Sequence, residues 1–159
     1  DLDTTAMLSD ALAQEGRLDD ATALLQKAIA SFKGRRAREL SVFHNRLARI
    51  SEARGDRDTA ITQLSTALDM DSQNGVVAAE LAYAAMDLQK WEVAIRALRA
   101  TTMLKQPGPL ARALAYQHLG EIARHQGDER RAATYLRRAL DEDSGLESAR
   151  ALLQSLTVR

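Results

Sequence analysis

Apolar residues recur at spacings of three and four along almost the whole chain, which is the pattern of amphipathic helices. Short polar breaks interrupt this pattern, and most of them contain glycine. Such breaks are typical of helix ends closed by a left-handed residue and of short connections between antiparallel helices. The spacing predicts nine helices and no sheet. The expected ranges are 3–15, 18–33, 36–54, 57–70, 75–88, 91–104, 109–126, 129–141 and 146–157.

A short segment that ends in alanine occurs four times. The first copy reads Gly-Arg-Leu-Asp-Asp-Ala and ends at Ala21, and the later copies end at Ala60, Ala94 and Ala132. The intervals between these alanines are 39, 34 and 38 residues. Self-similarity at a period of roughly 20 to 50 residues is the signature of repeat architectures. The sequence therefore predicts a stack of similar helical hairpins that share a continuous core.

The repeats resemble the tetratricopeptide-repeat motif over essentially the whole chain. The clearest match is the fourth repeat, which has Tyr116, Leu119, Gly120 and Ala123 in its first helix and Ala132, Leu136 and Ala139 in its second. The other matching positions are Leu8, Ala21, Leu25 and Ala28; Leu47, Ala48, Ala60, Leu64 and Ala67; and Leu81, Ala82, Ala94 and Leu98. The motif's closing proline is absent from all four repeats. The resemblance implies an all-α fold, a right-handed superhelical solenoid of antiparallel helix pairs.

We expect one repeat domain over residues 1–159, with repeats at about 2–34, 41–73, 75–106 and 113–144. Residues 145–157 are expected to form a capping helix that begins with a capping box of Ser144 and Glu147. The sequence starts at Asp1 rather than at methionine, so we expect it to be a piece of a longer protein.

The resemblance also implies where a partner would bind, because the first helix of each repeat lines the concave face in this family. The predicted groove residues are Asn45, Arg49, Glu52, Ala79, Tyr83, Met86, Gln117, Glu121 and Arg124, and the first repeat adds Ala6, Asp10 and Ala13. The expected function is therefore a protein-interaction module or scaffold that holds a peptide or protein partner. Self-association, a rigid spacer, and an accessory domain of a multidomain signalling protein are the alternatives.

Composition narrows the class of partner. Lys plus Arg and Asp plus Glu number 22 each, so no net field attracts nucleic acid, and we predict no nucleic-acid partner. No apolar run reaches the roughly 18 residues that would span a bilayer, and we predict no membrane insertion. The absence of cysteine leaves the compartment open, with the cytoplasm favoured. The excess of arginine over lysine hints at a bacterial gene.

No arrangement of residues predicts catalysis, a cofactor or a metal site. The three histidines, His44, His118 and His125, lack a third ligand at helical spacing. The acidic clusters at 69–71 and 141–143 lack the glycine and the distal glutamate of a calcium loop. Nucleotide-binding and nucleophile motifs are absent, so we predict that the chain is not an enzyme. We interpret the basic cluster of Arg35, Arg36 and Arg38 as a solvated turn. Trp91 is expected to pack against the neighbouring hairpin.

Overall fold

The computed structural model describes residues 1–34 and 37–157, and every regular element in this part of the chain is helical. The chain divides into two compact units, Asp1–Val77 and Ala78–Arg159. Each unit is described by itself below. The all-α class predicted from the spacing of apolar residues is confirmed for the described residues, while the single domain and the repeat bounds stay predictions.

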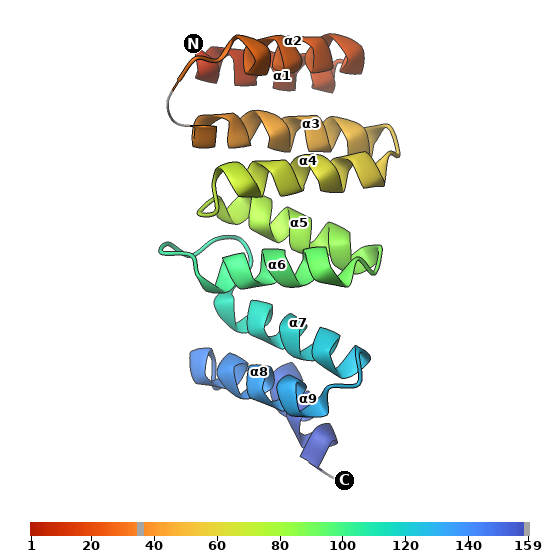
Figure 1. Ribbon diagram of the computed structural model, residues 1–159, viewed down its shortest axis with the longest axis vertical. Coiled ribbons are helices and arrows are strands. Elements are labelled where there is room, and N and C mark those ends of the chain that lie inside the picture. Colours follow the sequence, from red (N-terminus) through yellow and green to blue (C-terminus); the bar gives the residue numbers. More distant parts are fainter. Residues whose placement is uncertain (35–36, 158–159) are drawn as a thin grey trace. The chain divides into compact units, whose positions relative to one another are not determined.

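Unit 1 consists of two antiparallel helical hairpins and the start of a further helix (Figure 1). The first hairpin pairs α1 (Leu2–Gln14) with α2 (Leu18–Ser31), and the second pairs α3 (Ser41–Ala53) with α4 (Arg57–Met70). A short 3-10 helix, η1 (Ala37–Leu40), leads into α3. The unit ends with the first residues of α5 (Gly75–Asp87).

The core of unit 1 forms where α3 packs on the first hairpin. Phe43, Leu47 and Ile50 lie on one stripe of α3 and are 1%, 7% and 5% exposed. They belong to the same buried cluster as Ala21 and Leu25 of α2. One hairpin cannot bury its apolar face alone, so each hairpin is stabilised by covering the next.

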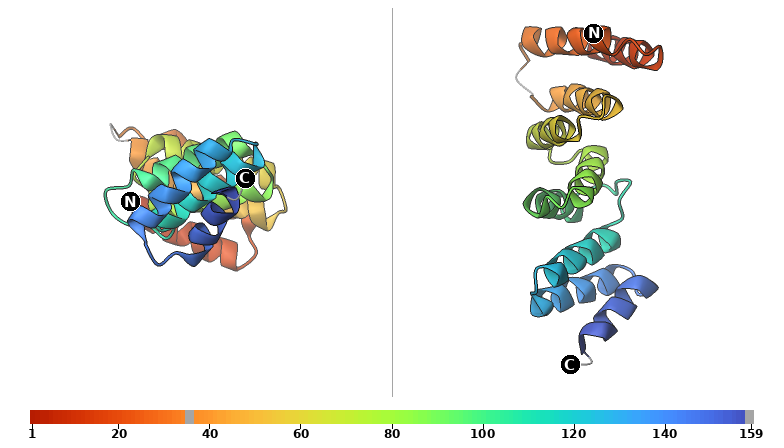
Figure 2. Two further views of the ribbon diagram at one scale, coloured as in Figure 1. Left: turned by 90° about the horizontal axis from the view of Figure 1, so that it is seen from below. Right: turned by 90° about the vertical axis from the view of Figure 1, so that its right-hand side faces the viewer.

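Unit 2 contains the rest of α5, then α6 (Trp91–Thr102), α7 (Arg112–His125), α8 (Glu129–Glu142) and α9 (Glu147–Thr157). The backbones of α7 and α8 approach closely at Gly120, where an added Cβ would lie 2.9 Å from Leu136 Cγ and 3.3 Å from the carbonyl oxygen of Ala132. The last helix, α9, packs against α8 (Figure 2) through a cluster around Leu136, Ala139 and Ala149. This helix therefore covers the apolar side of α8, as a capping helix does.

Three hairpins turn on a glycine in the left-handed region. Gly16, Gly55 and Gly127 have φ values of 79°, 78° and 81°. In each turn the residue after the glycine donates its backbone N–H to a carbonyl five residues earlier, as Asp56 does to Ser51 at 2.9 Å, which satisfies the last carbonyls of the helix. At the α5–α6 turn Gln89 takes the same conformation, with φ 55°. A side chain there is strained, because only glycine visits this region without a Cβ penalty.

Replacing Gln89 by glycine is therefore expected to stabilise the protein, by about 0.5–1 kcal/mol. The Lys90 N–H to Ala85 carbonyl bond, 2.8 Å long, would be kept because it uses only backbone atoms. Urea denaturation followed by circular dichroism measures the change. The matched control is Gly127→Gln, which should destabilise by a similar amount. If Gln89→Gly unfolds at a lower urea concentration than the wild type, the strain argument is wrong.

Three predicted helix starts differ from the structure. The helix expected at 36–54 begins as η1 and becomes α-helical at Ser41. The helix expected at 109–126 begins at Arg112, because Leu110 folds inward and is 3% exposed. Ala111 before it is extended. The predicted capping box of Ser144 and Glu147 does not start α9; the carbonyl of Leu146 receives the N–H of Arg150, and Asp143 Oδ1 holds the N–H of Gly145.

Candidate protein-binding surfaces

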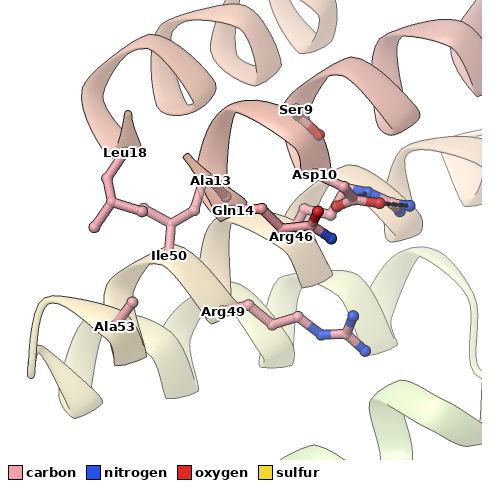
Figure 3. Close-up of a pocket in the computed structure, with 9 residues that line it drawn as sticks. All are labelled: Ser9, Asp10, Ala13, Gln14, Leu18, Arg46, Arg49, Ile50 and Ala53. Carbon is pink, nitrogen blue, oxygen red and sulfur yellow. Dashed lines mark hydrogen bonds and ion pairs between the residues drawn. The ribbon is translucent and has the colours of Figure 1, made fainter. Parts of the chain in front are cut away.

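A cavity in unit 1 opens between α1 and α3 and has a volume of about 380 Å³ (Figure 3). It is lined by Ser9, Asp10, Ala13, Gln14, Leu18, Arg46, Arg49, Ile50 and Ala53. We call it the α1–α3 pocket. Aliphatic side chains line one part of it, and two arginines and a carboxylate line another. Such a lining suits an apolar side chain that is flanked by polar groups.

An ion pair holds the polar part of the α1–α3 pocket in place. Arg46 donates from Nε to Asp10 Oδ1 at 2.9 Å and from Nη2 to Asp10 Oδ2 at 2.8 Å. The side chains are 21% and 46% exposed. Two parallel bonds of this kind are stronger and more directional than a single one. The pair therefore ties α1 to α3 and fixes the shape of the pocket.

Sequence reasoning placed Asp10, Ala13 and Arg49 on the binding face, and the structure brings these three together in the α1–α3 pocket. It did not single out Arg46. The available signal was the spacing of Arg46 and Arg49, which are three residues apart and therefore share one side of a helix.

The other residues proposed in unit 1 lie elsewhere or are covered. Asn45 is 6% exposed, so most of its side chain is withdrawn from a ligand. Ala6 is also buried, at 7%, while Glu52 is exposed near the end of α3. Neither Asn45 nor Glu52 lines the α1–α3 pocket.

In unit 2 two of the proposed residues belong to an internal hydrogen-bond network. Gln117 Nε2 donates to Glu121 Oε1 at 2.8 Å, and His118 Nδ1 donates to Glu121 Oε2 at 2.9 Å. Ser148 of α9 donates from Oγ to Gln117 Oε1 at 2.6 Å. The network thus links α9 to α7. It also occupies the side chains of Gln117 and Glu121, which the sequence analysis had assigned to ligand binding.

The same network acts on the carboxyl group of Glu121. The hydrogen bond from His118 lowers the pKa of Glu121, partial burial opposes that shift, and the bond from Gln117 adds to it. The charged form of Glu121 is therefore favoured in the folded protein.

The accessible part of this face in unit 2 is aromatic and apolar. The Tyr83 side chain is 47% exposed and meets His118 edge to face, with ring centroids 5.9 Å apart. Met86 is half-buried one turn further along α5, and Arg124 is exposed. Ala79 is 5% exposed. Tyr83 is therefore the residue proposed here that offers a ligand the largest ring surface.

Trp91 packs as expected. It is half-buried at the start of α6, and its ring lies 4.9 Å from the ring of His125 on α7, centroid to centroid. The indole therefore contacts the next hairpin.

The histidines, the acidic clusters and the basic cluster form no metal or ligand site in the part of the chain that the structure describes. No group of three or more His, Asp or Glu side chains there is arranged to hold a metal ion. His44 Nδ1 bonds Gln63 Oε1 at 2.8 Å, while its buried Nε2 has no partner. Of the basic cluster, Arg38 is exposed in η1, and Arg35 and Arg36 lie outside the described residues. Among the described helices, none has both the length and the apolar character needed to cross a bilayer.

Comparison with known proteins identifies the repeat. Residues 79–147 match the family model described as tetratricopeptide repeat. Residues 79–147 therefore carry the tetratricopeptide repeat. Proteins of this family generally mediate protein–protein interactions and are typically non-catalytic. A search of curated protein sequences found no match.

Solved structures support the same fold over nearly the whole chain. A crystal structure of MamA aligns with a TM-score of 0.64 at 18% identity and covers 93% of this chain and 81% of its own. PilF from Pseudomonas aeruginosa aligns with a TM-score of 0.59 at 19% identity, covering 98% and 67%. A tetratricopeptide repeat protein from Parabacteroides merdae aligns with a TM-score of 0.69 at 16% identity, covering 98% and 59%. These likenesses confirm the predicted fold class, a helical-repeat solenoid.

Proposed function

We propose that this tetratricopeptide-repeat chain is a protein-interaction module that holds a segment of a partner protein against the first helices of its hairpins. It acts by binding, without catalysis and without a cofactor. The observation that carries the proposal is the α1–α3 pocket, a cavity of about 380 Å³ in which aliphatic and charged side chains lie side by side. Recognition of a peptide uses such a combination of apolar anchor and polar rim.

The pocket suits one apolar side chain of a partner. Ala13, Leu18 and Ile50 supply aliphatic surface, and the small residue Ala53 leaves room beside them. Removing apolar surface from water stabilises a complex by about 25 cal/mol per Å². An inserted leucine or isoleucine would therefore provide most of the binding energy here.

The polar part of the pocket suits the backbone or a polar neighbour of that side chain. Asp10 and Arg46 neutralise each other, and Arg49 adds a guanidinium group to the lining. An acidic residue next to the apolar anchor would therefore be favoured over a basic one.

Tyr83 is proposed as the contact in unit 2. Its ring is about half exposed and is oriented by His118, and aromatic rings provide large contact areas at little cost in conformational entropy. Gln117 and Glu121 have their hydrogen bonds within the protein, so they are assigned a smaller part in binding.

A variant that fills the α1–α3 pocket tests the proposal. The wild type is used to select binders from a displayed library of random peptides, and the selected peptides are measured by fluorescence anisotropy. Ala13→Phe places a ring in the pocket and is expected to weaken binding by at least about ten-fold, which is about 1.4 kcal/mol. The matched control is Ala30→Phe, because Ala30 is exposed on α2 in the same unit and does not line the pocket.

Circular dichroism must first show that both variants are folded. Selected peptides that bind Ala30→Phe like the wild type and bind Ala13→Phe poorly would support the proposal. If Ala13→Phe binds the peptides as the wild type does, binding uses another surface. If selection returns no binder, the groove function is rejected. Arg49→Glu should separately reduce the preference for acidic peptides.

A further inference from the structure

Three arginines and two tyrosines gather on the surface of unit 2. Arg99 belongs to α6, Tyr116 to α7, and Arg131, Tyr135 and Arg138 to α8. The arginines are exposed and the tyrosines are half-buried. We call this group the arginine–tyrosine cluster. Described helices precede and follow α6, α7 and α8 in the chain, so the cluster is an interior feature of the repeats.

The tyrosine rings hold two of the guanidinium groups in place. The guanidinium carbon of Arg131 lies 6.0 Å from the centre of the Tyr135 ring, and that of Arg138 lies 5.9 Å from the centre of the Tyr116 ring. The two rings stack on each other, with 6.5 Å between their centres. A guanidinium group over a ring is attracted by the π electrons and keeps its N–H donors. The donors of both arginines are therefore positioned and remain available to an acceptor.

The ionisation of Tyr135 shows that this surface favours negative charge. Partial burial opposes ionisation of the hydroxyl, but the hydrogen bonds and charges of Arg99 and Arg131 outweigh it, so the pKa of Tyr135 is lowered from its ordinary value. Arg99 Nη2 donates to the Tyr135 hydroxyl at 3.4 Å. Nearby positive charges lower a pKa because they stabilise the anionic form. An anion from outside the protein would be stabilised at this place for the same reason.

Arginines elsewhere in unit 2 are paired with carboxylates. Arg112 Nη1 lies 3.7 Å from Glu142 Oε1, and Arg150 Nη1 lies 3.2 Å from Glu147 Oε1. In the arginine–tyrosine cluster the arginines contact tyrosines instead. Carboxylates from another molecule can therefore take the place that internal carboxylates take at the other two sites.

The arginine–tyrosine cluster is an open surface. The hollow beside Tyr135, lined in part by Arg99 and Arg131, has a volume of about 10 Å³. That volume is about what one water molecule requires, so a small anion would not be enclosed. A ligand must therefore gain its binding energy from several contacts spread over the surface. A chain that carries several carboxylates meets this condition.

The spacing of the arginines suits an extended chain. Arg131 and Arg138 are seven residues apart on α8, which corresponds to about 10 Å along a helix. A segment in the polyproline II conformation advances about 9 Å in three residues and returns every third side chain to the same side. Acidic residues at every third position would therefore place one carboxylate near each arginine.

Two features favour an acidic protein segment over nucleic acid. The residues at 128–129 and 141–142 are acidic, so the positive surface on α8 is short, whereas nucleic acid binds by neutralising many phosphates. Single-stranded bases also need a free aromatic face for stacking. The rings of Tyr116 and Tyr135 instead stack on each other and lie beneath arginines.

We propose that the arginine–tyrosine cluster is a docking surface for a short acidic segment of a partner protein, with Asp or Glu at about every third position. Arg131 and Arg138 bind the carboxylates, and Arg99 adds a donor beside Tyr135. The α1–α3 pocket lies in unit 1 and this cluster in unit 2, so the two are separate binding surfaces.

The probe is a short fluorescein-labelled peptide with glutamate at every third position and proline between. The control peptide has glutamine in place of every glutamate. Binding to the full chain is measured by fluorescence anisotropy at low ionic strength. The acidic peptide is expected to bind at least about ten-fold more tightly than the control. Its affinity should fall as salt is added, because salt screens exposed charges.

Two double variants of α8 locate the site. Arg131→Gln with Arg138→Gln removes the arginines that contact the rings and is expected to weaken binding by at least about ten-fold. The matched control is Arg130→Gln with Arg137→Gln, which should change binding by less than about two-fold. Arg130 and Arg137 are also exposed and seven residues apart, but they lie about 100° further around the helix. Both double variants remove two positive charges, so a difference between them reports position.

Circular dichroism must show that both double variants are folded. The proposal is wrong if the acidic peptide does not bind the wild type or binds no better than the glutamine peptide. Equal weakening by the two double variants would also overturn it, because net charge alone would then explain binding. A labelled oligothymidylate that binds more tightly than the acidic peptide would assign the cluster to nucleic acid. Ala13→Phe should bind the acidic peptide as the wild type does, so this proposal and the pocket proposal can fail separately.

Discussion

Replacing Phe43 by alanine is expected to lower the free energy of unfolding by about 3–5 kcal/mol. The ring is 1% exposed and lies in the cluster that joins α3 to the first hairpin. Its removal takes away the largest buried side chain of that cluster and leaves a cavity that the neighbouring helices fill only in part. Domains are commonly stable by about 5–15 kcal/mol, so this one change removes a large share. Urea denaturation followed by circular dichroism measures it.

The control for this prediction is the neighbouring residue. Val42 is 40% exposed, and Val42→Ala is expected to change the unfolding free energy by less than about 1 kcal/mol. An equal effect of the two alanine variants would show that α3 is not packed on the first hairpin as described.

The second large effect on the free energy of unfolding is expected where α7 and α8 cross. Gly120→Val places a branched side chain where a Cβ alone would lie 2.9 Å from Leu136 Cγ, and overpacking of this kind costs about 1–3 kcal/mol. Leu136→Ala, at a residue that is 1% exposed, costs about 2–5 kcal/mol because it opens a cavity.

Together the two changes are expected to cost less than the sum of the single effects. The space vacated at Leu136 can accept the new valine, and residues in direct contact couple by about 0.5–3 kcal/mol. A double-mutant cycle by urea denaturation gives the coupling energy. The control pairs Gly120→Val with Leu25→Ala in unit 1, where we expect simple additivity. Additive effects for Gly120 and Leu136 would contradict the close approach of these two helices.

Much of the local structure could be predicted from the sequence because its causes are local. The left-handed turns at Gly16, Gly55 and Gly127 depend on residues within one helical turn, and the sequence marked each of them with glycine followed by a polar residue. The start of α7 was predicted three residues too early. The burial of Leu110, a tertiary contact, keeps the chain out of the helix until Arg112.

For the binding face, the sequence predicted only which positions of each first helix face the groove. It did not predict which of those side chains are accessible. Asp10, Ala13 and Arg49 meet in one pocket, and Arg46 joins them because its guanidinium group reaches Asp10 across the two helices. Gln117 occupies an equivalent position in its repeat, but Ser148 of α9 bonds its side chain. Whether a side chain on this face is accessible to a ligand depends on the side chains that the neighbouring helix places beside it. Those side chains lie far away in the chain, as Ser148 does from Gln117 and Arg46 does from Asp10.

By itself, the sequence determined that the regular elements of the described residues are helices. It also determined the positions of most turns between these helices, and that the helical hairpins repeat. Periodicity and turn chemistry act within a few residues, so they can be read directly from the chain. The tertiary structure alone decided which members of the repeated pattern are covered. Leu47 and Leu8 occupy the same register, yet α2 buries the first and no described helix covers the second. Burial depends on the neighbour that packs against a residue, and a repeat specifies that neighbour only where the next hairpin is present.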